Sequence, residues 1–249
     1  MLKLCELIGG SHLYGINTPA SDEDVRYVFA NDELNRLVGI DRYELVERQN
    51  EEEDSFGYEI RHYLSLLRKT NTQVMDILYA PRDKFTLVHP LFERLVLDHK
   101  DKFVDSDRLY HSLKGYIQGE RARATGKAQA RVGKRKDAIA AFGYSPKNMT
   151  QLLRLTYVGI EFFRNNNYVV CLDGNPDFVK ELVEIKTTPE KFNVSYLSER
   201  SVAMERFMDA SYDGRDKTKD SKFDEAYANR VLFDIYNPMM AKHYSEMHL

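Results

Sequence analysis

Two aspartates, Asp22 and Asp24, stand two residues apart directly before an apolar run of the chain. Side chains at positions i and i+2 of a strand point to the same face, so on a strand the two carboxylates project together. Upstream, Gly10 and Ser11 form a turn in which glycine permits a positive φ and backbone N–H groups can cradle a phosphate. Paired carboxylates suit a hard divalent cation that also takes phosphate oxygens as ligands. The stretch therefore predicts nucleotide chemistry.

The acid pair needs a third carboxylate for this chemistry. Phosphoryl and nucleotidyl transfer depend on positioning and charge neutralisation, commonly by two metal ions about 3.5–4 Å apart. Asp54 is the first candidate because it opens an apolar segment, and Glu59 is the second, at an expected strand-to-helix switch. In the alternative interpretation Asp54 belongs to a solvated acidic loop and Glu59 caps a helix.

Basic residues offer two further candidate sites. Arg26 lies two residues after Asp24 and is predicted either to bind a carboxylate or phosphate, or to form a structural salt bridge with the acids. The second site is a basic segment without acids, which comprises Arg121, Arg123, Lys127, Arg131, Lys134, Arg135 and Lys136. Such a segment either attracts the phosphates of RNA or of a nucleotide, or is simply a solvated helix face.

Length and composition exclude several classes of protein. The 249 residues suffice for one large or two small domains with a real core. A net charge of −3 gives no global attraction to nucleic acid, so any basic surface must be local. Cys5 and Cys171 lie in apolar runs, which indicates buried free thiols in a reducing compartment. No segment resembles a signal peptide or membrane span, so the expected localisation is cytoplasmic.

Mixed patterns in the first part of the chain give way to helical ones. Residues 2–8 are apolar and fit either a helix or a strand, while residues 25–30 and 43–48 have the composition of strands. Residues 55–60 lead into an amphipathic helix over 61–69. From about residue 107 helical periodicity dominates, over 109–117, 147–164, 189–210 and 221–236. We therefore predict an N-terminal domain at 1–106 and an α-helical domain at 107–249.

Residues 10–26 read Gly-Ser-x-x-Tyr-Gly-x-x-Thr-Pro-x-Ser-Asp-x-Asp-x-Arg. This run resembles the signature of the DNA polymerase β-type nucleotidyltransferase superfamily, in the form found in RNA-repair-associated nucleotidyltransferases of bacteria and large phages. The resemblance is good over the first 80 residues and loose over 109–166. It continues through Asp54 and the following helix, but His62 replaces a usual lysine and Thr72 a usual proline.

The resemblance implies an α+β fold: an N-terminal mixed-sheet nucleotidyltransferase core, with a helix–turn–strand order around the Gly-Ser pair, followed by an α-helical lobe. Gly10 and Ser11 would hold the triphosphate. Asp22, Asp24 and Asp54 would bind two Mg²⁺ ions, with Mn²⁺ as the alternative ion. Lys147 and Arg154 would contact nucleotide phosphates from a helix of the family's Lys-x-x-x-His-x-x-Arg type, in which Gln151 here replaces the histidine.

The implied function is metal-dependent transfer of NMP from a nucleoside triphosphate to a hydroxyl acceptor, with release of pyrophosphate. The basic segment favours an RNA end as the acceptor. One alternative is transfer of NMP to a protein side chain. Another is a catalytically silent module of the same fold that binds a nucleotide or a partner protein.

Overall fold

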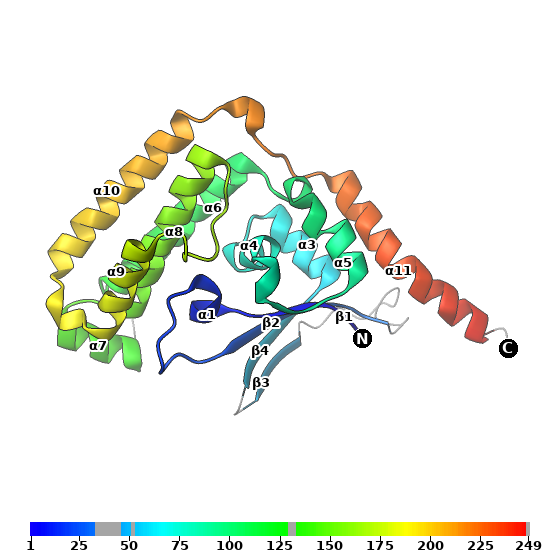
Figure 1. Ribbon diagram of the computed structural model, residues 1–249, viewed down its shortest axis with the longest axis horizontal. Helices are drawn as coiled ribbons and strands as arrows, with labels where there is room; N and C mark the ends of the chain where they lie inside the picture. Colours follow the sequence, from blue (N-terminus) through cyan, green and yellow to red (C-terminus); the bar gives the residue numbers. More distant parts are fainter. Residues whose placement is uncertain (33–45, 51–52, 129–132, 248–249) are drawn as a thin grey trace. The chain divides into compact units, whose positions relative to one another are not determined.

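A mixed sheet of five strands is the centre of the N-terminal half of the chain (Figure 1). The computed structural model describes residues 1–32, 46–50, 53–128 and 133–247. The strands lie in the order β3 (Val46–Asn50), β4 (Glu53–Glu59), β2 (Asp24–Ala30), β1 (Leu2–Ile8) and β5 (Phe85–Val88). β2 and β4 run parallel, whereas the other neighbouring pairs are antiparallel. The predicted α+β class is confirmed.

β1 resolves the ambiguity over residues 2–8 in favour of a strand, and the helix expected before the Gly-Ser pair is wrong. β1 pairs with β2 along its length and with β5 over Cys5–Leu7, so the sheet supplies hydrogen-bond partners on both sides of its centre. Leu4, Cys5 and Leu7 are fully buried. An apolar run this short has no periodicity that separates a buried strand from a buried helix, and pairing with other strands decides it.

The predicted helix after β4 is present as α3 (Ile60–Arg68). Its buried face consists of Ile60, Tyr63, Leu64 and Leu67, which recur at helical spacing. α4 (Thr72–Tyr79) follows, with the Asn71 side chain accepting a hydrogen bond from the Gln73 N–H as its N-cap. The short helix η1 (Arg82–Lys84) leads into the edge strand β5, and α5 (Pro90–Leu95) and η2 (Leu97–Phe103) follow that strand.

The chain forms two compact units. Unit 1 comprises Met1–Leu13, Ala20–Ser106 and Ser221–Leu249; unit 2 comprises Tyr14–Pro19 and Asp107–Asp220. The sequence predicts a single boundary, at 106/107. In the structure the chain passes from one unit to the other at this point and at three others. Helix α11 (Glu225–Met247) belongs to unit 1 because Val231, Ile235 and Tyr236 are buried there.

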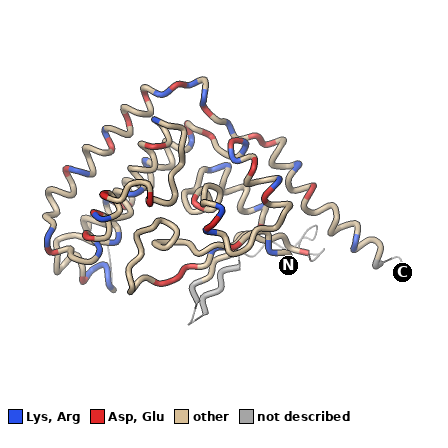
Figure 2. The backbone as a smooth tube through the Cα atoms, in the orientation of Figure 1, with Lys and Arg blue, Asp and Glu red and all other residues tan. Residues whose placement is uncertain are grey.

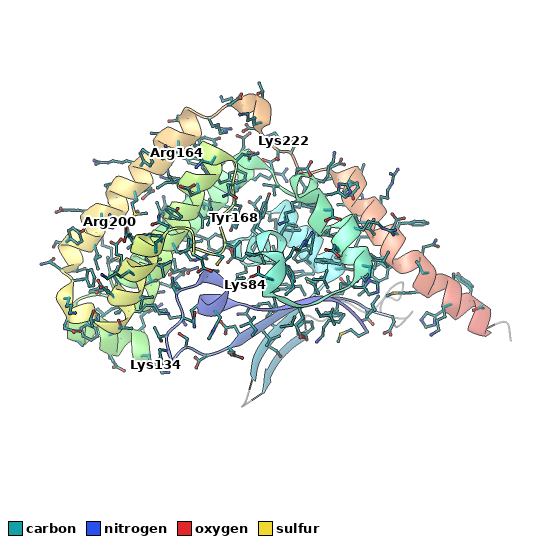
Figure 3. All side chains as sticks on the ribbon, viewed as in Figure 1. Lys84, Lys134, Arg164, Tyr168, Arg200 and Lys222 are labelled. Carbon is teal, nitrogen blue, oxygen red and sulfur yellow. The ribbon has the colours of Figure 1, made fainter. Side chains whose placement is uncertain are left out.

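Unit 2 is helical. Its main helices are α6 (Ser106–Ala124), α7 (Lys134–Phe142), α8 (Pro146–Asn165), α9 (Pro176–Thr187) and α10 (Val194–Asp213), with short turns η3 (Pro189–Lys191) and η4 (Lys217–Lys219). α8 and α10 pack closely: a Cβ added at Gly159 would lie 2.3 Å from the Met208 sulfur. Residues 168–172 form an irregular connection whose Tyr168, labelled in Figure 3, is buried.

An ion-pair cluster joins α6 to α10 in unit 2. Glu205 pairs with Lys114 and with Arg121, at 2.5 Å in each case, and Lys114 also lies 3.0 Å from Asp209. Burial alone would raise the pKa of Glu205, but the hydrogen bonds from Lys114 and Arg121 outweigh it and lower that pKa. The cluster fixes the relative register of two long helices. Across the described ranges, no helix is long and apolar enough to cross a membrane.

The docking of α11 generates a first prediction. The Tyr236 hydroxyl donates a hydrogen bond to the fully buried Glu59 carboxylate. Tyr236→Phe should lower the free energy of unfolding by about 1.5–3 kcal/mol, the range for a hydrogen bond to a charged group. Urea denaturation measures the change. Tyr244→Phe, at an exposed position of the same helix, is the control; equal stabilities of the two variants would contradict the structural role of the bond.

The α6–α10 cluster generates a second prediction. Because the pKa of Glu205 is lowered on folding, its stabilisation is present at neutral pH and is lost as pH falls through that lowered pKa. Glu205→Gln should reduce the free energy of unfolding at pH 7 by about 1–2 kcal/mol. The difference from wild type should shrink in denaturation curves below about pH 4. Glu199→Gln, at an exposed position of α10, should change neither value; a pH-independent difference would refute the ion-pair explanation.

Candidate active site

The signature begins where β1 ends and the chain turns into a short helix, α1 (Gly10–Tyr14). The Gly9 N–H donates a 2.6 Å hydrogen bond to the Asp24 carbonyl, which ties the turn to the first residue of β2. The Cβ position of Gly9 lies 2.9 Å from the Arg26 Cγ. The turn and the beginning of β2 are therefore in direct contact.

Gly10 is required by both its conformation and its surroundings. Its φ is +60°, in the left-handed region that favours glycine. A Cβ at this position would lie 2.2 Å from the Asp24 Oδ2 atom, far inside contact distance. The Asp24 carboxylate thus lies against the backbone of the glycine-serine turn. The predicted anion cradle and one predicted metal ligand are immediate neighbours.

Asp22 and Asp24 do not share a strand. β2 begins at Asp24, so Asp22 lies in the segment before it, and the shared-face argument applies only to Asp24. Asp22 is exposed and Asp24 is half-buried. The acidic run 22–24 is visible as a red stretch leading into β2 in Figure 2. The His12 Nε2 atom lies 3.5 Å from the Ser21 carbonyl oxygen, which places α1 beside this run.

The parallel pairing of β2 with β4 brings the Asp54 position next to Asp24. The Cα of Asp54 is the register partner of the Cα of Asp24 in the β2–β4 ladder. The two positions are 30 residues apart in sequence, so only the sheet brings them together. Among the side chains that the structure describes, which exclude that of Asp54, no group of three potential metal ligands is found.

Glu59 lies elsewhere. It pairs in register with Phe29, five residues further along the ladder than Asp54, or about 16 Å at roughly 3.3 Å per residue. Its Oε2 accepts from the Arg61 and His62 N–H groups, while Oε1 accepts from the Arg61 side chain and the Tyr236 hydroxyl. Glu59 is thus the N-cap of α3, the alternative interpretation of the sequence, and we leave it out of the metal set.

The Arg26 side chain contacts an aromatic ring, a contact that the sequence analysis does not predict. Its guanidinium carbon lies 5.8 Å from the centre of the Phe56 ring, over its face, and the two residues are register partners. None of the carboxylate side chains that the structure describes, which exclude those of Glu53 and Asp54, forms an ion pair with it. A cation–π contact at a half-exposed site holds the side chain beside the sheet while leaving its charge uncompensated by these groups.

The second part of the signature is held by the helical unit. The Leu172 N–H donates to the Tyr14 carbonyl at 3.1 Å, and the Lys186 ammonium donates to the Ile16 carbonyl at 2.8 Å. Gly15, with φ +74°, has the Asp173 Oδ1 atom only 2.4 Å from where a Cβ would be. Sequence reasoning gave these residues no role, although the Tyr-Gly pair of the motif is the signal that marks the position.

Arg154 contacts the same segment. It is only 1% exposed, and its guanidinium carbon lies 3.6 Å from the centre of the Tyr14 ring. Its Nε donates to the Gln151 side chain at 3.1 Å. Lys147, seven residues earlier in the same helix, is exposed. The structure therefore places Arg154 against the signature itself.

The basic segment is partly neutralised. Arg121 pairs with Glu205, and Arg123 lies 2.5 Å from Glu120, so acids distant in sequence or just outside the segment reduce its charge. Exposed lysines remain at 127, 134 and 136, and Figure 3 labels Lys134 at the start of α7. Arg131 lies outside the described residues. What is left is a shorter patch around the start of α7.

Residues 4–234 match the model of a family described as RlaP, the RNA repair pathway DNA polymerase beta family. Neither the curated proteins nor the solved structures gave a match. The matched region contains the glycine-serine turn, the acid positions on β2 and β4 and the whole of the helical unit. The chain belongs to the RNA repair pathway DNA polymerase β family and is a polymerase β-like nucleotidyltransferase.

Proposed function

We propose that this enzyme transfers NMP from a nucleoside triphosphate to a hydroxyl group at an RNA end and releases pyrophosphate. The proposal rests on the contact between the glycine-serine turn and the acids. The Asp24 carboxylate lies against Gly10, and Asp54 is the register partner of Asp24. A phosphate cradle beside converging carboxylates fits a triphosphate and its counter-ions. An RNA acceptor agrees with the repair pathway that gives the family its description.

In the proposed reaction the acceptor hydroxyl oxygen attacks the α-phosphorus. A new P–O bond forms, the bond from the α-phosphorus to the bridging oxygen of the β-phosphate breaks, and the hydroxyl proton passes to water. The backbone N–H groups around Gly10 and the Ser11 hydroxyl bind the β- and γ-phosphates. Arg26, held over Phe56, places a positive charge at the same end of β2.

Asp22, Asp24 and Asp54 are the residues that would hold divalent cations. Their oxygen donors suit Mg²⁺, or Mn²⁺ in its place, and the β2–β4 register puts two of the three positions side by side. Bound there, two ions would neutralise the triphosphate and lower the pKa of the acceptor hydroxyl. The chain's own contribution is to fix Asp24, through the Gly9 hydrogen bond to its carbonyl, at a constant position relative to the cradle.

The acceptor would be bound through the exposed basic residues near the start of α7. Lys127, Lys134 and Lys136 are exposed. Arg121 and Arg123, which are in ion pairs, are less suited to phosphate contact. Contacts from lysines to phosphates carry no base information, so this surface would bind RNA of any sequence.

The acid set generates a prediction about activity. Asp24→Asn and Asp54→Asn should each reduce transfer of label from an α-³²P-labelled nucleoside triphosphate to a short RNA by more than about 100-fold, since loss of even an outer-shell partner of a metal costs 10–100-fold. Glu23→Gln, an exposed neighbour between the aspartates, is the matched control and should retain activity.

The same assay separates the alternatives. Label that appears on protein would support the protein-modifying activity, and nucleotide binding without any transfer would support a silent module. Full RNA labelling by the double variant Asp22→Ala, Asp24→Ala would refute the assignment of the site.

Gly10 generates a second prediction about activity. Gly10→Ala places a methyl group 2.2 Å from the Asp24 carboxylate and strains a φ of +60°, so either the turn or the acid must move. We expect at least about a 100-fold loss of kcat/KM, because even small displacements of reacting groups are this costly. Gly174→Ala, where a Cβ meets open space, is the control. Equal activity of the two variants would show that the turn does not position Asp24.

A further inference from the structure

The side chain of Arg26 crosses a buried glycine, Gly9, to which neither the signature that begins at Gly10 nor the proposed function assigns a role. A Cβ built on Gly9 would lie 2.9 Å from the Arg26 Cγ and 3.8 Å from the Arg26 Nε. Carbon atoms in contact are normally about 3.5–4.0 Å apart. The stem of Arg26 therefore fills the space that any side chain at position 9 would need.

An aromatic ring holds the same side chain from the next strand. β2 lies between β1 and β4, and Phe56 of β4 is the register partner of Arg26. The Phe56 ring packs in turn against the ring of Tyr58, with 4.7 Å between the ring centres. Tyr58 is 3% exposed, and its hydroxyl donates a 3.1 Å hydrogen bond to the Gln73 side chain. Because the core lies behind Phe56, its ring is a fixed surface for the guanidinium.

The two contacts set the direction of the Arg26 side chain. Gly9 directly precedes Gly10 and Ser11, the predicted phosphate cradle, so the Arg26 Nε lies beside the start of that turn. The nearest acid along the strand is Asp24, whose carboxylate lies against Gly10. In the proposed function divalent cations neutralise Asp24, which leaves the charge of Arg26 for the phosphates. All five residues belong to unit 1.

Confinement of the side chain before the substrate arrives has an energetic consequence. Arginine has more rotamer freedom to lose on binding than most side chains. A group that the protein already holds in place loses less of this freedom when it meets its ligand. A glycine on one side of Arg26 and an aromatic ring on the other provide such confinement without adding a competing charge.

We propose that Gly9 and Phe56 are positioning residues, which together hold the Arg26 guanidinium beside the cradle so that it binds a terminal phosphate group of the nucleoside triphosphate. Gly9 acts through the absence of a side chain and Phe56 through the face of its ring, and neither touches the substrate. The inference rests on the proposed function, since it takes the triphosphate as the anion. The guanidinium forms charge-assisted hydrogen bonds to phosphate oxygens, and it transfers no proton.

Substitution of Gly9 tests the steric part of the proposal. Gly9 is not among the glycines with a positive φ, so its backbone accepts alanine. The added methyl group must displace the Arg26 Cγ, which changes χ1 and moves the whole side chain. Gly9→Ala should raise the Kd for inorganic tripolyphosphate and for each ribonucleoside triphosphate by about 10- to 100-fold, as expected for a lost charge-assisted hydrogen bond.

Isothermal titration at one Mg²⁺ concentration, below the melting temperature of each variant, measures these constants. Gly174→Ala, whose added Cβ meets open space, is the matched control and should bind as wild type. An unchanged Kd for a folded Gly9→Ala protein would overturn the proposal.

A double-mutant cycle separates this effect from a general disturbance of the turn. Arg26→Ala should by itself weaken binding by about 10- to 100-fold. This variant has no Cγ at position 26, so adding Gly9→Ala should weaken binding by less than about 2-fold more. Two losses that multiply would overturn the proposal, because Gly9→Ala would then act on the turn or on Asp24 and not on Arg26.

The ring is tested by a pair of variants that also serves if Gly9→Ala does not fold. Phe56→Leu keeps an apolar side chain but removes the ring, and it should raise the Kd for tripolyphosphate by about 2- to 5-fold, the range for a cation–π contact near the surface. Phe56→Tyr keeps the ring and should bind as wild type. Equal affinities of these two variants would overturn the role of Phe56.

The positioning proposal and the proposed function fail differently. If wild-type protein binds a triphosphate and labels RNA while Gly9→Ala and Phe56→Leu bind as wild type, only the inference about positioning fails. If wild-type protein neither binds a triphosphate nor transfers label, the proposed function itself fails.

Discussion

The contact of the Asp24 carboxylate with the Gly10 backbone is the constraint on which the candidate site depends. It requires a residue without a Cβ at position 10 and a strand that begins at Asp24. The Gly9 hydrogen bond to the Asp24 carbonyl holds the two together. Since β2 is paired on both sides, by β1 and by β4, the acid cannot shift without disturbing the centre of the sheet. The sheet therefore keeps Asp24 at a fixed position in the candidate site.

The parallel pairing of β2 with β4 has the same importance for the third acid. In this ladder one register step of two residues would move Asp54 by about 7 Å, enough to separate it from Asp24. The other end of β4 serves stability instead. There Glu59 caps α3 and accepts a hydrogen bond from Tyr236 of α11. One buried carboxylate thereby connects the first turn of α3 with α11. On one strand, therefore, Glu59 has a structural role, while Asp54, five residues before it, is the register partner of Asp24.

The signature is divided between the two units. Its glycine-serine turn and aspartates belong to unit 1, while Tyr14–Pro19 belongs to unit 2. Arg154, Leu172 and Lys186 each contact this short segment through a different kind of interaction. The motif is therefore long for a structural reason as well as a chemical one. Its two ends carry the candidate site residues, and its middle packs within the helical unit.

The sequence by itself determined the chemistry and the kind of fold. Gly10, Ser11, Asp22 and Asp24 stand close together in the chain, so their types and spacing are local information, and so is the helical period that predicted α3 and α8. Only the tertiary structure places Asp54 opposite Asp24 and Glu59 at the N-cap of α3, because strand register is set by pairing between distant segments. The tertiary structure also decided that residues 2–8 form a strand, that α11 returns to unit 1, and that Lys186 contacts the carbonyl of Ile16. Each of these features depends on which buried surface or backbone group a residue contacts. The spacing of residues in the sequence does not indicate a contact partner that lies 30 or 170 residues away.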